Sequence, residues 1–205
     1  MVSFREGHIL SAERKPVDRR KQVIEAAKRS FASFGYKATT MEQVAKLAGV
    51  GKGTIYTFFS NKEQLFDEIM SGMIHDMREI AEETLNSSLP FAETLTGVLS
   101  RLLDYRDRHQ LAVKLSQEVR DIGTAVAKEG LDQLEGAIVA FIARHVKVYV
   151  DRGEVKPCDP DLTAYLMLKT YLALTVDGPY LRQPLGKEEV LKHFRFYWME
   201  GLAVR

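Results

Sequence analysis

The chain has 205 residues, of which 45% are hydrophobic and 28% charged, values typical of a globular protein with one or two small domains. No apolar run approaches the roughly 18 residues of a membrane-spanning helix, and the N-terminal residues lack the apolar segment of a signal peptide. We therefore expect a cytoplasmic protein with no membrane partner.

The net charge of +1 hides an uneven distribution. Residues 1–62 carry 12 Lys and Arg against 5 Asp and Glu, a net +7, whereas residues 63–205 carry 17 against 23, a net −6. A basic segment fused to an acidic one is typical of a polyanion-binding head on a separate body. DNA is favoured over anionic lipid as the polyanion, because the basic segment contains no amphipathic helix with a large aromatic face.

The first 34 residues divide into a polar segment and a helix. Residues 1–17 are expected to form a flexible basic arm, which either stays solvated or touches the DNA backbone or minor groove. Residues 18–34 are predicted to form a helix that braces the following motif and ends at Gly35. Its apolar residues recur three and four positions apart: Val23, Ala27, Phe31 and Phe34.

Residues 40–59 predict two short helices joined by a tight turn, the pattern of a helix-turn-helix. Thr40 and Gln43 have the spacing of a capping box, and Gly49 stands where a helix ends in the left-handed conformation. In the second helix Ile55, Phe58 and Phe59 share an inward face. The outward residues are Lys52, Gly53, Thr54, Tyr56 and Thr57. Such a unit sets its second helix into the major groove, although a generic two-helix corner is the alternative.

Side-chain chemistry assigns roles to the expected DNA contacts. Lys52 and Thr57 are predicted to read base edges, because Lys can donate to guanine and Thr offers a hydroxyl and a methyl group. Lys62 would combine its charge with the positive end of the helix that it begins. The residues expected on phosphates are Lys37, Thr40, Gly53, Thr54, Tyr56 and Lys62.

Beyond residue 61 the apolar spacing remains helical, and no strand alternation occurs. A capping box of Ser60 and Glu63 is expected to begin a connecting helix over 62–86. Further helices are expected over 91–108, 109–120, 124–151, from 161, and 188–202. The predicted fold class is all-α. A three-helix DNA-binding domain (18–61) would be joined by the connecting helix to a C-terminal helical domain (62–205) for effector binding and dimerisation.

The last two helices are unusually apolar for terminal elements, which predicts that they pack against a second copy of the chain. Helix-turn-helix proteins present two recognition helices to successive major grooves, so a homodimer is expected. The alternative is that these residues fill the monomer core. The predicted interface residues are Tyr165, Leu168, Leu172, Val190, Phe194, Tyr197 and Trp198.

The body also offers apolar helices with a few polar side chains, the usual composition of a small-molecule pocket. An uncharged or amphipathic effector is expected, such as an acyl chain, a drug or an aromatic compound. The candidate residues are Tyr105, His109, Phe141, His145, Tyr149, Tyr171 and Thr175. His145 could equally be a satisfied core histidine, and Glu118, near Arg120 and Asp121, is expected on a solvated turn.

Enzymatic chemistry is not indicated. The 5 histidines lack the paired spacing of metal ligands, no phosphate-binding glycine loop is present, and no Ser-His-Asp or Cys-His set is evident. We expect no metal and no cofactor. The single cysteine, Cys158, is interpreted as an incidental loop residue, with redox sensing as the alternative.

The segment from Thr40 to Phe66 resembles the DNA-binding signature of the tetracycline-repressor (TetR) family. The matching residues are Ala48-Gly49-Val50, Lys52-Gly53-Thr54-Ile55-Tyr56, Phe58-Phe59, Lys62-Glu63 and Leu65-Phe66, with Phe34-Gly35-Tyr36 upstream. The resemblance implies a dimeric, ligand-responsive transcriptional regulator, most often a repressor that a small effector releases from operator DNA. An effector-independent architectural or constitutive DNA-binding protein is the alternative.

Two positions depart from the family pattern. Gly51 stands where the family usually has Ser or another capping residue, so the recognition helix is expected to start more loosely. Phe58 stands where many members have Tyr, so a hydroxyl for a phosphate contact is expected to be missing.

Overall fold

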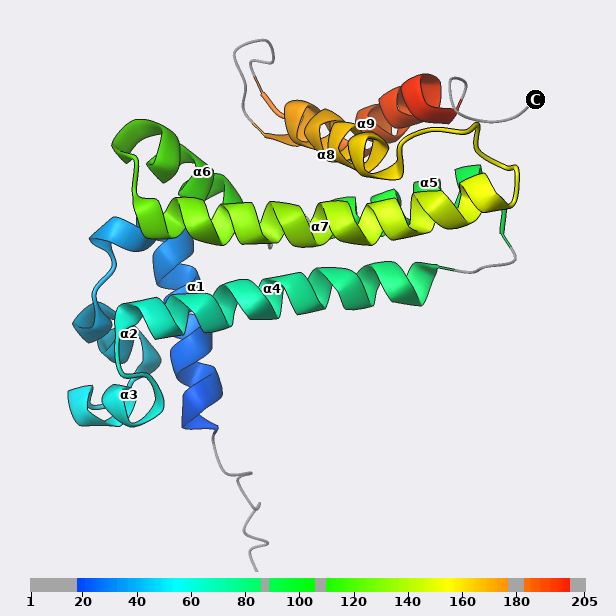
Figure 1. Ribbon diagram of the computed structural model, residues 1–205. Coiled ribbons are helices and arrows are strands. Elements are labelled where there is room, and N and C mark those ends of the chain that lie inside the picture. The colour runs from blue at the N-terminus through cyan, green and yellow to red at the C-terminus, as the bar shows by residue number, and fades with distance from the viewer. Residues whose placement is uncertain (1–17, 86–88, 106–109, 177–182, 200–205) are drawn as a thin grey trace, which may run out of the picture.

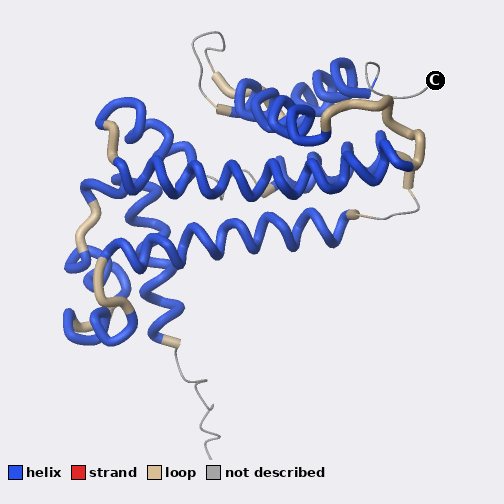
Figure 2. The backbone as a smooth tube through the Cα atoms, viewed as in Figure 1, coloured by secondary structure: helices blue, strands red, loops and turns tan. Residues whose placement is uncertain are grey.

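The computed structural model describes residues 18–85, 89–105, 110–176 and 183–199. These residues form helices joined by loops, with no strand among them (Figures 1 and 2), which confirms the predicted fold class. The helices are α1 (Arg19–Ala38), α2 (Met41–Ala48), α3 (Lys52–Phe58), α4 (Lys62–Thr84), α5 (Phe91–Asp104), α6 (Gln110–Ile122), α7 (Ala125–Asp151), α8 (Pro160–Thr175), α9 (Lys187–Phe194) and the π-helix η2 (Arg195–Met199). None of the described helices is long and apolar enough to span a bilayer. The predicted arm, residues 1–17, lies outside the described residues.

The first helix is capped by Asp18, whose side chain accepts a hydrogen bond from the N–H of Lys21 at 3.1 Å. Its regular path breaks at Gly35, which has φ 84° and ψ 175°, a conformation that glycine adopts without a steric penalty. The predicted break at Gly35 is confirmed. Phe31 is fully buried, whereas Phe34 is 58% exposed, so the apolar spacing does not extend the buried face as far as Phe34.

The helix-turn-helix forms as its local chemistry predicts. Gln43 N–H donates to the Thr40 hydroxyl at 3.2 Å, and Thr40 N–H donates to the Gln43 side-chain oxygen at 2.9 Å, which completes the capping box. Gly49 ends α2 in the left-handed conformation, with φ 67° and ψ 30°. Gly51 precedes α3 without a side-chain cap, as expected, and Ile55 holds α3 against the core.

The connecting helix α4 begins at residue 62, as predicted, but its cap differs from the expected one. Gln64 N–H donates to the Asn61 side chain at 2.7 Å, and the Gln64 side chain accepts from Ser60 N–H at 2.7 Å. The cap is therefore Asn61 with Gln64, and the predicted box of Ser60 with Glu63 is wrong.

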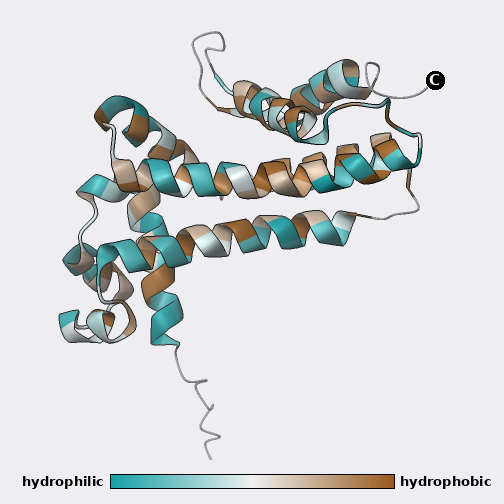
Figure 3. Cartoon of the chain, in the orientation of Figure 1, coloured by the Kyte–Doolittle hydropathy of each residue, from teal (hydrophilic) through white to brown (hydrophobic). Residues whose placement is uncertain are grey.

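Helices α4 and α7 lie side by side, and α1 crosses them at one end (Figure 1). Gly130 of α7 permits their close contact, because a Cβ atom there would lie 2.8 Å from Cε1 of Phe66. One hydrophobic cluster continues from α1–α3 through α4 into α6 and α7. Figure 3 shows its apolar turns in brown along the middle of α1 and α4. The predicted domain boundary at residues 61 and 62 stays a prediction, but the core does not stop there.

Helix α8 packs on the side of α7 that faces away from α4 (Figure 1), and α9 packs against α5 and α8. A second cluster, which includes Phe91 and Tyr149, lies towards the C-terminal end of α7, and Cys158 packs against it, half-buried. A third cluster joins Leu99 and Leu103 of α5 to Val190 and Phe194 of α9. The body is thus a layered helical bundle with the helix-turn-helix at one end.

Candidate nucleic-acid interface and effector cavity

The outer face of α3 presents the residues that the sequence assigned to DNA. Lys52, Tyr56 and Thr57 are exposed there, while Ile55 on the opposite face is fully buried. The Lys52 ammonium lies 2.7 Å from a carboxylate oxygen of Glu42 on α2, and this hydrogen bond raises the pKa of Lys52. The Thr57 hydroxyl donates to the carbonyl of Thr54 at 2.7 Å, which leaves its oxygen available to accept a hydrogen bond.

Gly53 has no structural reason to be glycine among the described residues. A Cβ atom placed there would meet nothing within 4 Å, and its φ is not positive. Glycine inside a helix costs about 1 kcal/mol relative to alanine. The residue therefore weakens α3 without relieving any contact that the structure describes.

Lys62 points inward rather than toward solvent. Its ammonium donates to the carbonyls of Tyr36 and Thr39, both at 2.9 Å, and lies 4.2 Å from the centre of the Tyr36 ring. Burial lowers the pKa of Lys62, and the nearby Glu118 carboxylate opposes that shift. The predicted phosphate contact of Lys62 is not supported, because its donors already hold the chain between α1 and α2.

Glu118 of α6 is buried, with 6% of its surface exposed, so the expectation of a solvated turn is wrong. Its two carboxylate oxygens accept the backbone N–H of Lys37 at 3.1 and 3.2 Å. A Cβ atom on Gly35 would collide with this carboxylate, so the position requires glycine for space as well as for its backbone angles. The sequence did contain a signal, since Leu111, Leu115 and Glu118 share one helical face.

Residues 35–40, which we call the junction, are therefore held from two sides. Glu118 binds the junction from α6, and Lys62 binds it from α4. Within the junction the Thr39 hydroxyl donates to the Gly35 carbonyl at 2.8 Å. The junction leads directly into the cap of α2, so its position sets the position of the helix-turn-helix. The side chains of Lys37 and Thr40 remain exposed beside it.

A cavity of about 200 Å³ lies within the body, between α4, α5, α6, α7 and α8. Its lining is almost entirely apolar; among the described residues that line it, the polar or charged ones are Arg78, Ser116, Tyr171 and Thr175. Of the predicted effector residues, Phe141, Tyr171 and Thr175 do line it. This arrangement can hold an apolar small molecule that has few polar groups.

The other predicted effector residues lie elsewhere. The Tyr105 hydroxyl donates to Asp76 at 3.4 Å, and the Tyr149 hydroxyl donates to Thr94 at 2.9 Å within the second cluster. His145 is half-buried and forms a hydrogen bond with its own helix, 2.8 Å from the Phe141 carbonyl, so its ring is satisfied within α7. None of these three lines the cavity, so the cavity does not support their assignment. His109 lies outside the described residues.

The predicted dimer residues divide into two groups. Tyr165 and Tyr197 are exposed, by 42% and 61%, whereas Leu168, Val190 and Phe194 are buried within the protomer, so the structure does not support an interface role for these three. Leu172 and Trp198 are half-buried, and Leu172 lines the cavity together with Leu168 and Phe194.

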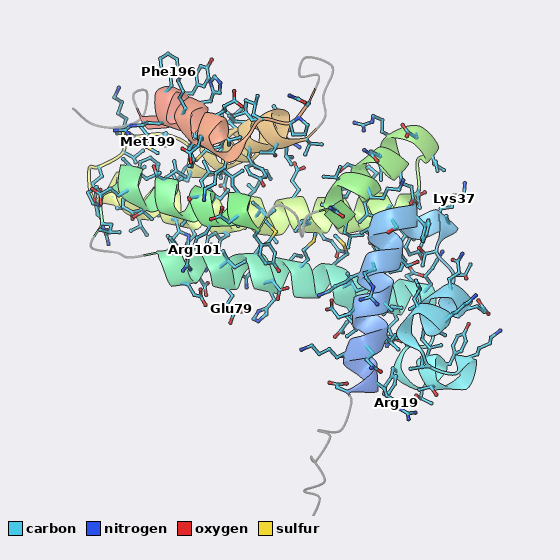
Figure 4. The ribbon with its side chains drawn as sticks, turned by 180° about the vertical axis from the view of Figure 1, so that it is seen from behind. Arg19, Lys37, Glu79, Arg101, Phe196 and Met199 are labelled. Carbon is cyan, nitrogen blue, oxygen red and sulfur yellow. The ribbon has the colours of Figure 1, made fainter. Side chains whose placement is uncertain are left out.

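Helix α8 and the π-helix η2 both expose large apolar side chains, including some that the sequence did not single out. We refer to these residues together as the C-terminal apolar face: Leu162, Tyr165, Leu166, Phe196 and Tyr197. Figure 4 shows Phe196 at one end of the molecule and Lys37 at the other. The part of the chain that the structure describes contains no cluster of three or more side chains able to bind a metal ion.

Residues 23–69, which contain the whole helix-turn-helix, match the sequence profile described as "Bacterial regulatory proteins, tetR family". The chain is 46% identical over 187 residues to the HTH-type transcriptional regulator YhgD of Bacillus subtilis, an alignment that covers 91% of this chain and 98% of that protein. It is 29% identical over 116 residues to the fatty acid metabolism regulator protein of the same organism, covering 56% of this chain and 60% of that one.

Among solved structures, Salmonella enterica GusR is similar to the whole fold. The TM-score is 0.73 at 20% identity, over 91% of this chain and 96% of that one. The match of the helix-turn-helix to the family profile and the 46% identity to a relative over almost its full length lead to the same conclusion. The chain belongs to the tetR family of bacterial transcriptional regulators.

Proposed function

We propose that the protein is a homodimeric repressor that leaves its operator DNA when a small apolar or amphipathic effector occupies the cavity. One observation carries this proposal. The two helices that hold the junction also line the cavity, α6 with Ala112, Val113 and Ser116 and α4 with Met73 and Met77 among others. A molecule in the cavity therefore touches both supports of the helix-turn-helix.

The DNA contacts follow from the exposed face of α3. Lys52 and Thr57 would meet base edges, and Gly53 would allow the backbone of α3 to approach a phosphate. For Lys52 to reach a base, its ammonium must leave Glu42. This step is easy, because both side chains are more than half exposed and an exposed ion pair contributes little. The phosphate contacts would come from Lys37, Thr40, Thr54 and Tyr56.

The coupling would run through packed side chains and two charged groups. Ser116 lines the cavity, and Glu118 lies two residues further along the same helix. A shift of α6 would thus move the carboxylate that holds Lys37, and a shift of α4 would move Lys62. Either shift would change the separation of the two recognition helices from the roughly 34–36 Å between successive major grooves. Such coupling is typically about 1–3 kcal/mol and is reciprocal.

The dimer would form through the C-terminal apolar face, because large apolar side chains that the protomer leaves exposed there would be buried by a second copy. The two helix-turn-helix domains of the dimer would then project from the same side of the assembly to meet DNA in the cytoplasm.

The apolar lining favours an effector with a hydrocarbon body. The 29% identity to a protein named for fatty acid metabolism supports an acyl chain over an aromatic compound. The alternative, an architectural protein without an effector, predicts that side chains fill the interior of the C-terminal helical domain and leave no cavity. The cavity of about 200 Å³ speaks against that alternative.

The test begins with DNA fragments selected by the purified protein from a random pool, which supplies the operator. Decanoate affinity is then measured by calorimetry with and without that operator. We expect operator to weaken decanoate binding by about 5- to 150-fold, and decanoate to weaken operator binding by the same factor. Equal decanoate affinity in the two states would contradict release by such an effector.

A further inference from the structure

We propose that the effector carries an anionic head on its acyl chain, and that the guanidinium of Arg78 binds this head at the edge of the cavity. The inference rests on the proposed effector cavity and adds the chemistry of its polar end. It identifies Arg78 as a residue that determines effector specificity.

Two of the hydroxyl groups in the lining, those of Ser116 and Thr175, are poor candidates for holding a polar head. The Ser116 hydroxyl donates to the Ala112 carbonyl at 2.9 Å, and the Thr175 hydroxyl donates to the Tyr171 carbonyl at 2.7 Å. Each hydroxyl proton is thus committed to a carbonyl of its own helix. A carboxylate or phosphate needs donors, and these two groups offer only acceptor capacity in their present positions.

Arg78 differs from these hydroxyl residues because it is charged and its donors are available to bind a ligand. Of the described residues that line the cavity, it alone carries a charge. It is exposed on α4, and no hydrogen bond or ion pair is recorded for its guanidinium within the described parts of the chain. By contrast, Arg101 of α5 is paired with Glu83 at 3.0 Å.

The shape of the arginine side chain suits this position. Its methylene stem can lie along apolar surface while the charged group stays at the solvent boundary. The planar guanidinium presents parallel donors that match two oxygens of a carboxylate or phosphate. The cavity and Arg78 together therefore fit a molecule with an apolar body and an anionic end.

The volume of the cavity limits the size of the effector's apolar part. About 200 Å³ exceeds the roughly 150 Å³ of a dry apolar cavity that holds benzene, and lies below the roughly 300 Å³ at which ordinary ligand pockets begin. A single hydrocarbon chain of medium length fits this range better than a fused polycyclic body.

Three ten-carbon probes with different heads test the inference: decanoate, decanol and decylammonium. Their dissociation constants for the full-length protein are measured by calorimetry without DNA, so the result does not depend on operator release. We expect decanoate to bind about tenfold more tightly than decanol, as one charge-assisted hydrogen bond at a solvent-accessible site would give. Decylammonium should bind most weakly. Each methylene added from octanoate to decanoate should tighten binding about fourfold.

Two substitutions assign the preference to Arg78. Arg78→Met keeps an apolar stem and should bind decanoate no better than decanol, while Arg78→Glu should favour decylammonium. Arg101→Met removes the same charge from a neighbouring helix outside the cavity lining, and should keep the wild-type preference. Decyl phosphate, tested alongside decanoate, shows which of the two anionic heads the site prefers.

The outcomes separate this inference from the proposed function. If the wild-type protein binds the three probes equally, binds none of them, or if Arg78→Met retains the preference for decanoate, the assignment of Arg78 is overturned. If decanoate binds with a preference that depends on Arg78 but does not weaken operator binding, the assignment stands and effector release fails.

Discussion

The backbone N–H of Lys37 donates to both carboxylate oxygens of Glu118, which lies 81 residues further along the chain. This contact joins the end of α1 to α6 without using the Lys37 ammonium, which stays exposed. The backbone of Lys37 therefore belongs to the proposed link between the cavity and the helix-turn-helix, while its exposed side chain is available for the proposed DNA contact. The two roles can be tested by separate substitutions.

Replacing Glu118 by glutamine should weaken the link between cavity and helix-turn-helix. The glutamine amide keeps one acceptor oxygen for the N–H of Lys37 but loses the negative charge. Its NH₂ group replaces the second acceptor oxygen and would face the same N–H, donor against donor. We expect a loss of about 1–3 kcal/mol in the free energy of unfolding, measured by urea denaturation, and a smaller effect of decanoate on operator affinity. Glu79→Gln, on the exposed side of α4, is the control and should change neither. An unchanged unfolding free energy in Glu118→Gln would contradict the buried contact.

Replacing Gly53 by alanine should separate stability from DNA binding. Because nothing described lies within 4 Å of the added Cβ, helix propensity should stabilise the protein by up to about 1 kcal/mol. If the backbone of α3 approaches a phosphate, the same methyl group should reduce operator affinity, measured by fluorescence anisotropy. Gly136→Ala is a matched control, since it adds a methyl group in open space on α7, away from the helix-turn-helix. Equal operator affinity in Gly53→Ala and the wild type would refute the close approach.

Lys62 and Lys37 should respond in opposite ways to substitution by methionine. Lys62→Met leaves two carbonyls of the junction without their donor, so we expect a loss of about 1–3 kcal/mol in unfolding free energy. The salt dependence of operator binding by the Lys62→Met protein should remain that of the wild type. Lys37→Met should leave stability unchanged and flatten the salt dependence by about one unit, as the loss of one phosphate contact predicts. A flattened dependence in Lys62→Met would restore the phosphate contact expected from sequence.

Replacing Leu166 by lysine should dissociate the proposed dimer. The side chain is 45% exposed at the C-terminal apolar face, so the protomer should fold while a buried charge disrupts the interface. Sedimentation velocity should show a monomer, and operator affinity should fall because one recognition helix supplies too few contacts. Ile122→Lys, 54% exposed on α6, serves as the control and should remain dimeric. A Leu166→Lys protein that stays dimeric would place the interface elsewhere.

Short-range chemistry made the helix-turn-helix predictable. The capping box of Thr40 with Gln43 and the left-handed Gly49 depend on residues at most four positions apart, and both form as expected. The break at Gly35 likewise follows from the absence of a side chain at that position. The family resemblance rests on this same segment.

The sequence by itself thus determined the all-helical fold class, the motif that faces DNA and the helices of the body, because capping, turns and apolar spacing act over a few residues. Only the tertiary structure decided that Lys62 holds the junction, that Glu118 is buried, and that Leu168 faces the cavity while Leu166 faces solvent. Helix α8 is apolar on several sides, so its spacing could not distinguish a core face from a partner face. The environment of a charged side chain likewise depends on groups far away in sequence, as the contact between Lys37 and Glu118 shows.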